Sequence, residues 1–125
     1  MMNNRLSSGS PFEEKIGYSR AVVDENYIFI SGTTGYDYDT MAISEDIAEQ
    51  THQCFKNIEH ALQECGSSIQ HIVRVVYILP NREEFEDTWP VLRAWLGEVK
   101  PAATMFEARL MNDEMKIEIQ VTARR

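Results

Sequence analysis

The stretch that decides the fold is Met115–Ala123, which reads MKIEIQVTA. Apolar and polar residues alternate along it without a break, so each set shares one face of an extended chain. A period of two is typical of a β-strand that buries one side. The polar side carries Lys116, Glu118 and Gln120. We expect this side to face a cleft or a neighbouring subunit.

The segments before this strand predict the rest of a sheet. Thr104–Leu110 is a second candidate strand, and the polar turn at 111–114 would join it to Met115–Ala123 in a closing hairpin. Tyr18–Val23 and Tyr27–Ser31 are β-rich runs separated by three polar residues, which predicts another hairpin. Ile69–Leu79 is rich in β-branched residues and apolar on both faces, as expected of a central strand.

Two amphipathic helices are expected between these strands. Apolar residues recur at helical spacing from Ile47 to Cys65, with Ser44 as the expected N-cap and Gly66 as the stop. A second apolar series runs from Phe85 to Val99. Pro90 lies inside this series, so the second helix either kinks there or begins just before it.

The resulting order, ββαβαββ, predicts an α/β protein of the α+β type: a two-layer sandwich in which two helices pack on one face of a mixed sheet. A length of 125 residues is enough for one domain with its own core, so we expect a single domain over residues 1–125. Its first twelve residues are rich in serine, asparagine and glycine, and we expect them to be loose.

Composition excludes several classes of protein. The formal net charge of −8 argues against a nucleic-acid-binding surface, which needs a cluster of basic residues. No apolar run is long enough to span a membrane, and the N-terminus has no signal-peptide pattern. Cys54 and Cys65 lie eleven residues apart on one predicted helix, too far for a disulfide. We therefore expect a cytoplasmic protein without a membrane or nucleic-acid partner.

The histidines do not form a metal-binding pattern. His52 and His60 lie eight residues apart on the first helix, and His71 opens the central strand. No acidic or cysteine motif at metal-ligand spacing accompanies them, so we expect no metal site.

The chain resembles the RidA/YjgF family of reactive-intermediate deaminases, formerly called L-PSP endoribonucleases. The matching residues occur in order from Tyr18 to the C-terminus, and no single one of them is specific. They are Tyr18, Phe29–Gly32, Asn57, Leu62, Gly66, Ile72–Val75, Phe85, Pro101-Ala102 and Ile117–Ile119. The resemblance implies a chorismate-mutase-like fold and a homotrimer with three clefts between subunits. It also implies hydrolysis of 2-imino and 2-enamino acids to 2-keto acids and ammonia, without a metal or organic cofactor.

Carried over by position, the resemblance implies a set of residues that line the cleft. Gln120 and Tyr18 are the candidate catalytic residues. The candidate ligand-binding residues are Ser31, Gly32, Trp89, Ala103, Met105 and Glu107. Taken by itself, Phe29–Gly32 has two interpretations. It is either a strand that ends in a glycine turn, or a site in which Ser31 is a hydroxyl donor and the missing side chain of Gly32 lets a ligand approach the backbone.

Three of these positions depart from the pattern of the deaminating members. Where this chain has Ala103, those members carry an arginine that binds the substrate carboxylate. They carry a glutamate where this chain has Gln120, and an amide cannot accept a proton at neutral pH. Trp89 replaces a small polar residue. Trp89 either narrows the cleft or belongs to the core beside Phe85.

Two functions follow as expectations. The first is a RidA-like protein that binds a small metabolite between subunits and hydrolyses a reactive imine or enamine other than a simple 2-imino acid. The second is a catalytically inactive binding or regulatory module on the same trimeric fold. A ribonuclease role is a third possibility that the acidic charge opposes. A proton-transfer group in the cleft other than Gln120 would separate the first function from the second; Tyr18 and Glu107 are the candidates.

Overall fold

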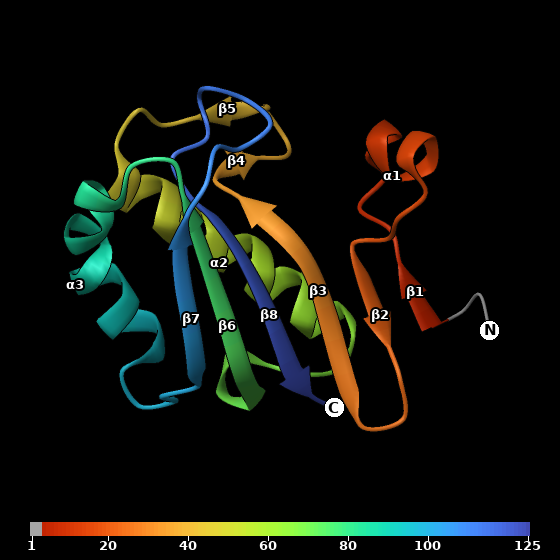
Figure 1. The fold of residues 1–125 in the computed structure, drawn as a ribbon. Helices are drawn as coiled ribbons and strands as arrows, with labels where there is room; N and C mark the ends of the chain where they lie inside the picture. Colours follow the sequence, from red (N-terminus) through yellow and green to blue (C-terminus); the bar gives the residue numbers. More distant parts are fainter. Residues whose placement is uncertain (1–3) are drawn as a thin grey trace.

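The structure is a computed structural model that describes residues 4–125. Its main feature is a six-stranded mixed sheet with helices packed against one face (Figure 1). The strand order is β1-β2-β3-β8-β6-β7. These strands are β1 (Arg5–Leu6), β2 (Ala21–Val23), β3 (Tyr27–Thr34), β6 (Ile72–Leu79), β7 (Ala102–Glu107) and β8 (Glu118–Arg124). The remaining elements are α1 (Pro11–Ile16), β4 (Tyr36–Asp37), β5 (Ala42–Ile43), α2 (Ile47–Glu64), the 3₁₀ turns Ile69–His71 and Arg82–Glu84, and α3 (Phe85–Leu96).

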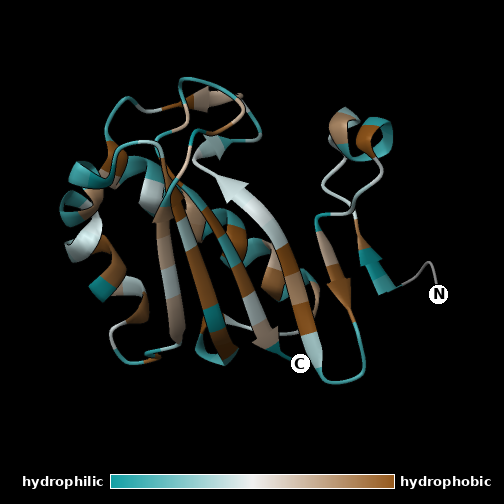
Figure 2. Ribbon diagram, in the orientation of Figure 1, coloured by the Kyte–Doolittle hydropathy of each residue, from teal (hydrophilic) through white to brown (hydrophobic). Residues whose placement is uncertain are grey.

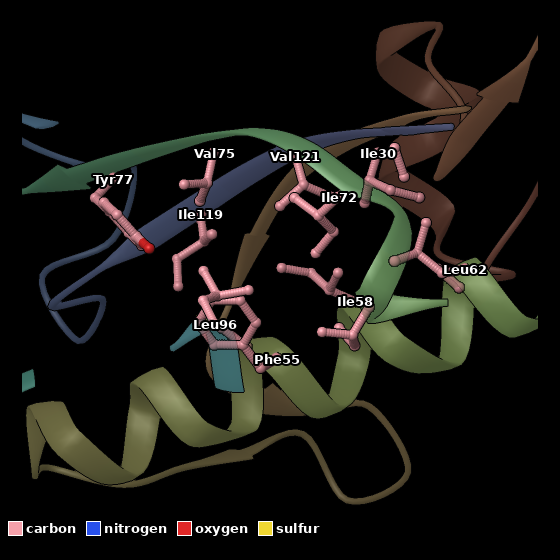
Figure 3. Close-up of a cluster of buried hydrophobic side chains, with 14 of the residues drawn as sticks. Ile30, Phe55, Ile58, Leu62, Ile72, Val75, Tyr77, Leu96, Ile119 and Val121 are labelled. Atoms are coloured by element: carbon pink, nitrogen blue, oxygen red, sulfur yellow. The ribbon is translucent and has the colours of Figure 1, made fainter. Parts of the chain in front are cut away.

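The core lies between the sheet and the helices. Alternate residues of the strands point toward α2, as the period-two pattern predicts, and Figure 3 shows them meeting Phe55, Ile58 and Leu62 of that helix. On β8 the inward residues are fully or almost fully buried; they are Ile119, Val121 and Ala123. The two-layer α+β fold and the ββαβαββ order of the main elements are confirmed.

The expected closing hairpin is wrong. β7 pairs in parallel with β6, whereas β8 lies between β3 and β6 and is antiparallel to both. Ten residues, 108–117, separate β7 from β8, which is long enough for the chain to pass over β6 instead of turning directly back. Since β8 is central, its apolar face is covered along its whole length.

The N-terminal expectation is also wrong over the part that the structure describes. β1 pairs with β2, and α1 begins at Pro11 with the Ser10 hydroxyl accepting a hydrogen bond from the Phe12 amide at 3.2 Å. Residues 1–3 lie outside the described residues.

Several element ends differ from their expected positions. Asp46, rather than Ser44, caps α2, because its carboxylate accepts a hydrogen bond from the Glu49 amide at 2.9 Å. Gly66 follows α2 with a φ of 81°, as expected of a helix stop. α3 begins at Phe85 and runs through Pro90. The residues between α2 and β6 form a 3₁₀ turn, so the central strand begins at Ile72.

The sheet face away from the helices carries both polar and aromatic side chains. Glu118 and Gln120 of β8 point to this open face, but Lys116 precedes the strand and its ammonium lies 3.8 Å from the Glu84 carboxylate. Phe29 on β3 is 45% exposed and Phe106 on β7 is 50% exposed. In the hydropathy colouring of Figure 2, brown apolar segments alternate with white and teal ones along the strands of the sheet. The open face therefore combines polar groups with apolar area.

Candidate functional site

A bulge in β3 is the centre of the candidate site. Ile30 pairs with Val121 and Thr33 with Ile119, so the two residues Ser31 and Gly32 together lie opposite the single residue Gln120. An extra residue of this kind bends the strand and redirects neighbouring side chains. Two of the expected ligand-binding residues, Ser31 and Gly32, therefore form the irregular part of the sheet.

Gly32 lets the carboxylate of Glu118 lie against the bulge. A Cβ atom built on Gly32 would lie 2.9 Å from Glu118 Cδ and would overlap Glu118 Oε2. The φ of Gly32 is not in the left-handed region, so its importance here lies in the space it leaves rather than in backbone strain. We conclude that the close approach at Gly32 is made by a side chain of the same molecule.

A buried arginine is hydrogen-bonded to the bulge. Arg20 is only 8% exposed, and its Nη2 donates a hydrogen bond of 2.8 Å to the carbonyl oxygen of Gly32. Its Nη1 donates to the Tyr38 hydroxyl at 3.3 Å. The guanidinium thus connects the bulge to the segment after β4.

Burial determines the electrostatics of this cluster. Loss of solvent raises the pKa of the half-buried Glu118 carboxyl, and the positive charge of Arg20 opposes this increase. Burial also raises the pKa of the Cys54 thiol of α2, and the nearby charge of Glu118 adds to this effect. Cys54 is therefore a neutral thiol, which donates to the Thr33 carbonyl, and Glu118 is the group suited to proton transfer.

The role expected of Ser31 is different in the structure. Its hydroxyl donates a hydrogen bond of 2.6 Å to the Ser19 carbonyl, so its proton is already used. The expectation that Ser31 acts as a hydroxyl donor is wrong for this conformation; Ser31 can accept a hydrogen bond from a ligand.

The two expected catalytic residues lie near this cluster. Tyr18 follows α1, is 41% exposed, and is close enough to Tyr38 for the two phenols to interact electrostatically. Gln120 is exposed on the open face, beside the bulge. Tyr18, Ser31, Gly32 and Gln120 are thus brought together, with Glu118 as an additional member.

The other expected residues form a second group at the opposite edge of the sheet. Ala103 and Met105 of β7 are in register with Val75 and Tyr77 of β6, whose side chains point toward the helices. Trp89 of α3 is 44% exposed and therefore does not belong to the core. It contacts Phe85 edge-on, with ring centroids 6.3 Å apart.

Glu107, also in this second group, already has a partner. Its Oε2 accepts a hydrogen bond of 2.9 Å from the backbone amide of Arg82. Glu107 therefore links the end of β7 to the 3₁₀ turn before α3.

The two groups do not meet within one chain. Gln120 is in register with Val76 on the open face, whereas Ala103 and Met105 lie on the face of the helices, and β6 separates β7 from β8 (Figure 1). Two clefts of the single chain, of about 620 and 210 Å³, are lined by none of the expected site residues. The larger lies between the β4–β5 hairpin and α2, and the smaller lies beside Pro80 and Arg109.

Glu118, Arg20 and Tyr38 belong to the candidate site but were not among the residues predicted from the sequence. Glu118 could have been found, because it lies on the polar face of the deciding strand and beside Gln120. Its contact with Gly32 depends on how β8 pairs with β3, which local pattern does not reveal. For Arg20 and Tyr38 the sequence carries no comparable signal.

The histidines have separate partners. His52 accepts a hydrogen bond of 3.0 Å from the Trp95 indole, His60 lies 3.0 Å from Glu64, and His71 lies 3.1 Å from the Ser67 hydroxyl. Within residues 4–125, no three or more histidine, cysteine, aspartate or glutamate side chains are grouped as a metal site requires. In the same part of the chain, none of the helices has both the length and the apolar character needed to cross a membrane.

Comparison with known proteins gives consistent matches along the chain. A sequence model of the family described as Endoribonuclease L-PSP matches residues 10–125. A RutC family protein from Pyrococcus abyssi is 33% identical over 107 residues, which cover 85% of this chain and 84% of that protein. The human 2-iminobutanoate/2-iminopropanoate deaminase is 25% identical, with 85% of this chain and 78% of that protein covered. A solved structure of a YjgF/YER057c/UK114 family member from Mycobacterium tuberculosis matches with a TM-score of 0.88 at 30% identity, over 97% of this chain and 98% of the other.

Proposed function

Because the chain belongs to the RidA/YjgF family, whose sequence model is described as Endoribonuclease L-PSP, we propose that it hydrolyses a small reactive imine or enamine between subunits. The observation that carries this proposal is the position of Glu118. Its carboxylate is half-buried, lies against Gly32 of the bulge, and has a pKa raised by burial. A carboxylate whose pKa is raised is a stronger base than an ordinary one, and it is therefore better suited to accept a proton from water. It supplies the proton-transfer group that Gln120 cannot.

The reaction follows from the chemistry of a protonated C=N bond. The Glu118 carboxylate takes a proton from water while the water oxygen bonds to the imine carbon, which gives a neutral carbinolamine. The carboxyl then returns this proton to the nitrogen, and the C–N bond breaks as the hydroxyl oxygen forms the carbonyl. The hydroxyl proton passes to the released ammonia. The products are a carbonyl compound and ammonium, and Glu118 ends as a carboxylate.

The substrate that we propose lacks a carboxylate beside the imine carbon. One relative is named as a 2-iminobutanoate/2-iminopropanoate deaminase, and its substrates carry such a group. Ala103 presents only a methyl group where we align the arginine of the deaminating members. Trp89, exposed beside Phe85, would add a flat apolar surface to the second half of the site.

A site between subunits is supported by the separation of the two residue groups. Tyr18, Ser31, Gly32 and Glu118 lie at the bulge, whereas Trp89 and the β7 residues lie at the opposite edge and on the other face. Two chains that place the β7 edge of one beside the bulge of the next would complete the site. We propose a homotrimer, in which the open face of each sheet, with Phe29 and Phe106, packs against its neighbours.

An imine-trapping assay tests the proposed function. A flavin amine oxidase generates uncharged imines from alkylamines, and an amino-acid oxidase generates imines with a carboxylate. Semicarbazide captures the imine that escapes hydrolysis. We expect the protein to reduce the capture of imines that lack a carboxylate and to have little effect on the capture of 2-imino acids. Glu118→Gln should lower the rate by about 10²- to 10⁴-fold.

The matched control is Glu98→Gln, which removes an exposed carboxylate just after α3. This variant should retain the wild-type rate. A wild-type protein that hydrolyses neither kind of imine, or a Glu118→Gln variant with full activity, would reject the proposed hydrolase. The remaining candidate would then be the inactive binding module, which the loss of the arginine at Ala103 favours.

The cytoplasm is the location that we propose, on the basis of the unpaired cysteines Cys54 and Cys65. A relative from Saccharomyces cerevisiae is named as a mitochondrial protein. Fractionation of cells that produce the full chain would test the location, and recovery with an organelle would contradict it.

A further inference from the structure

Arg20 is a buried charge that the proposed reaction does not use. It is 8% exposed and precedes β2, directly behind the bulge. Two ion pairs occur within residues 4–125, His60–Glu64 and Lys116–Glu84, and Arg20 belongs to neither of them. A buried guanidinium without a carboxylate in direct contact is costly, so its presence requires an explanation.

The hydrogen bonds of Arg20 explain only part of its position. Nη2 donates to the Gly32 carbonyl at 2.8 Å, and Nη1 donates to the Tyr38 hydroxyl at 3.3 Å. In the described part of the chain, its Nε is the one buried side-chain nitrogen or oxygen without a hydrogen-bond partner. The neutral acceptors thus satisfy the guanidinium incompletely.

Glu118 is the carboxylate nearest to this charge among the contacts of Gly32. Arg20 donates to the carbonyl of Gly32, and the Glu118 carboxyl occupies the space beside the Cα of Gly32, so both charged groups lie against the same residue. The other titratable groups that act on this pair are Cys54 of α2, and Tyr18 and Tyr38 beside Arg20. Burial raises the pKa of the Cys54 thiol and of the Tyr38 hydroxyl, so both groups are neutral near pH 7. Lys116 lies near Glu84 instead.

We propose that Arg20 is a positioning residue that fixes the Ser31–Gly32 bulge through the Gly32 carbonyl and stabilises the Glu118 carboxylate, which lies against the same glycine. The guanidinium supplies a fixed positive charge that replaces the solvent removed from Glu118. The bond to Gly32 keeps the bulge open, so that the carboxylate has room beside it. The effect on catalysis rests on the proposed function, whereas the effect on Glu118 ionisation does not.

Loss of this charge has a defined consequence for Glu118. Burial raises the Glu118 pKa and Arg20 lowers it, so removal of the guanidinium leaves the first effect unopposed. The titration midpoint should move to higher pH. If the proposed function holds, the acidic limb of the hydrolysis rate moves in the same direction, because less carboxylate remains near neutral pH.

The direct measurement is a carboxyl titration by NMR of protein labelled with ¹³C at the glutamate side-chain carboxyl, with Glu118 assigned from the Glu118→Gln variant. Arg20→Gln should move the Glu118 midpoint to higher pH, and Arg20→Lys should move it less. The matched control is Arg74→Gln. Arg74 is an exposed arginine whose Nη2 donates to Thr104 on the adjacent strand, and its loss should leave the midpoint unchanged. An unchanged midpoint in Arg20→Gln would overturn the proposal.

A measurement on the wild-type chain covers the case in which Arg20→Gln does not fold. The ¹⁵N resonance of Arg20 Nε should change with pH at the same midpoint as the Glu118 carboxyl, and Glu118→Gln should abolish that change. A resonance that does not follow Glu118 would also overturn the proposal. A shifted midpoint without any imine hydrolysis would leave the Arg20 role standing and reject the function alone.

Discussion

Burial disfavours the charged form of the Glu118 carboxyl, and the same burial makes this carboxyl suitable for proton transfer. Its carboxylate is half-buried, lies against Gly32, and has no cation within ion-pair distance among residues 4–125. Charged groups in such positions lower stability, and proteins retain them where they serve a function. The carboxyl is therefore the residue whose substitution should affect stability and activity in opposite directions.

The stability of Glu118→Gln should depend on pH with a definite sign. Desolvation, only partly opposed by Arg20, raises the folded-state pKa of Glu118 above its ordinary value of 4.5. Because the folded protein binds this proton more tightly than the unfolded chain does, protonation of Glu118 stabilises the fold. This contribution to the free energy of unfolding is fully present below the unfolded-state pKa and is lost as pH rises through the folded-state pKa. Glu118→Gln should therefore be more stable than the wild type in urea at pH 7. The difference should shrink below pH 4.5; a variant less stable at pH 7 would contradict the assignment.

Ala103→Arg should extend the substrate range to imines that carry a carboxylate. An arginine there would supply a bidentate, charge-assisted contact of about 1.5–3 kcal/mol, or roughly 10- to 100-fold in rate at low substrate concentration. Ala103→Met provides the control, because it adds length without charge. Ala103 is exposed on β7, so either side chain can be accommodated. Equal gains for the two variants would mean that the β7 position does not contact the carboxylate.

At the scale of elements, the bulge of β3 matters because it lies where three segments meet. β8 supplies Glu118, the residues before β2 supply Arg20, and the segment after β4 supplies Tyr38. Directly after the bulge, Gly35 lies against α2, where a Cβ would be 2.7 Å from Gln50 Cα. The two glycines therefore have different functions: Gly32 makes room for a site residue, and Gly35 allows β3 to approach the helix.

This difference predicts distinct outcomes for two alanine substitutions. Gly35→Ala should destabilise the protein by about 1–3 kcal/mol, because the new methyl group meets helix backbone that cannot move. Gly32→Ala should cost less stability, because the end of the Glu118 side chain can rotate away. It should nevertheless lower hydrolysis, since Glu118 is displaced. Urea unfolding measures the stability of both variants, and the imine assay measures their activity. Equal losses of stability in the two variants would refute the different functions assigned to the two glycines.

The elements that could be predicted from the sequence are those fixed by local pattern. Apolar periodicity predicts α2 and the buried face of β8, because each residue of the pattern packs on the same side. The position of β8 between β3 and β6 was missed, because adjacency in the chain favours a hairpin with β7. The prediction of a Ser44 cap is wrong because Asp46, two residues later, has the same capability and caps the helix.

The site was harder to predict for a related reason. Ser31 and Gly32 were found from the resemblance and lie in the bulge. Glu118 and Arg20 were missed, because their roles depend on a contact across the sheet and a bond from a neighbouring segment. No periodic pattern marks such pairs in one sequence.

At the scale of the whole molecule, the separation of the two residue groups supports the proposed assembly. Phe29 and Phe106 are about half exposed on the open face, and Trp89 is exposed beside β7. Apolar residues in such positions are typical of surfaces that pack against a partner. Light scattering should therefore give three times the chain mass of 14.4 kDa at micromolar concentration. A mass of one chain would remove the shared site.

Mixing two inactive variants tests the central claim, a hydrolytic site shared by two chains, most directly. Glu118→Gln lacks the proton-transfer group, and Ala103→Trp should block the β7 half. Mixed trimers, refolded together from equal amounts, should have both halves intact in about one quarter of their sites, because each site joins different surfaces of neighbouring chains. We predict that the mixture regains about that fraction of the wild-type hydrolysis rate. A refolded mixture as inactive as its components would contradict a site between subunits.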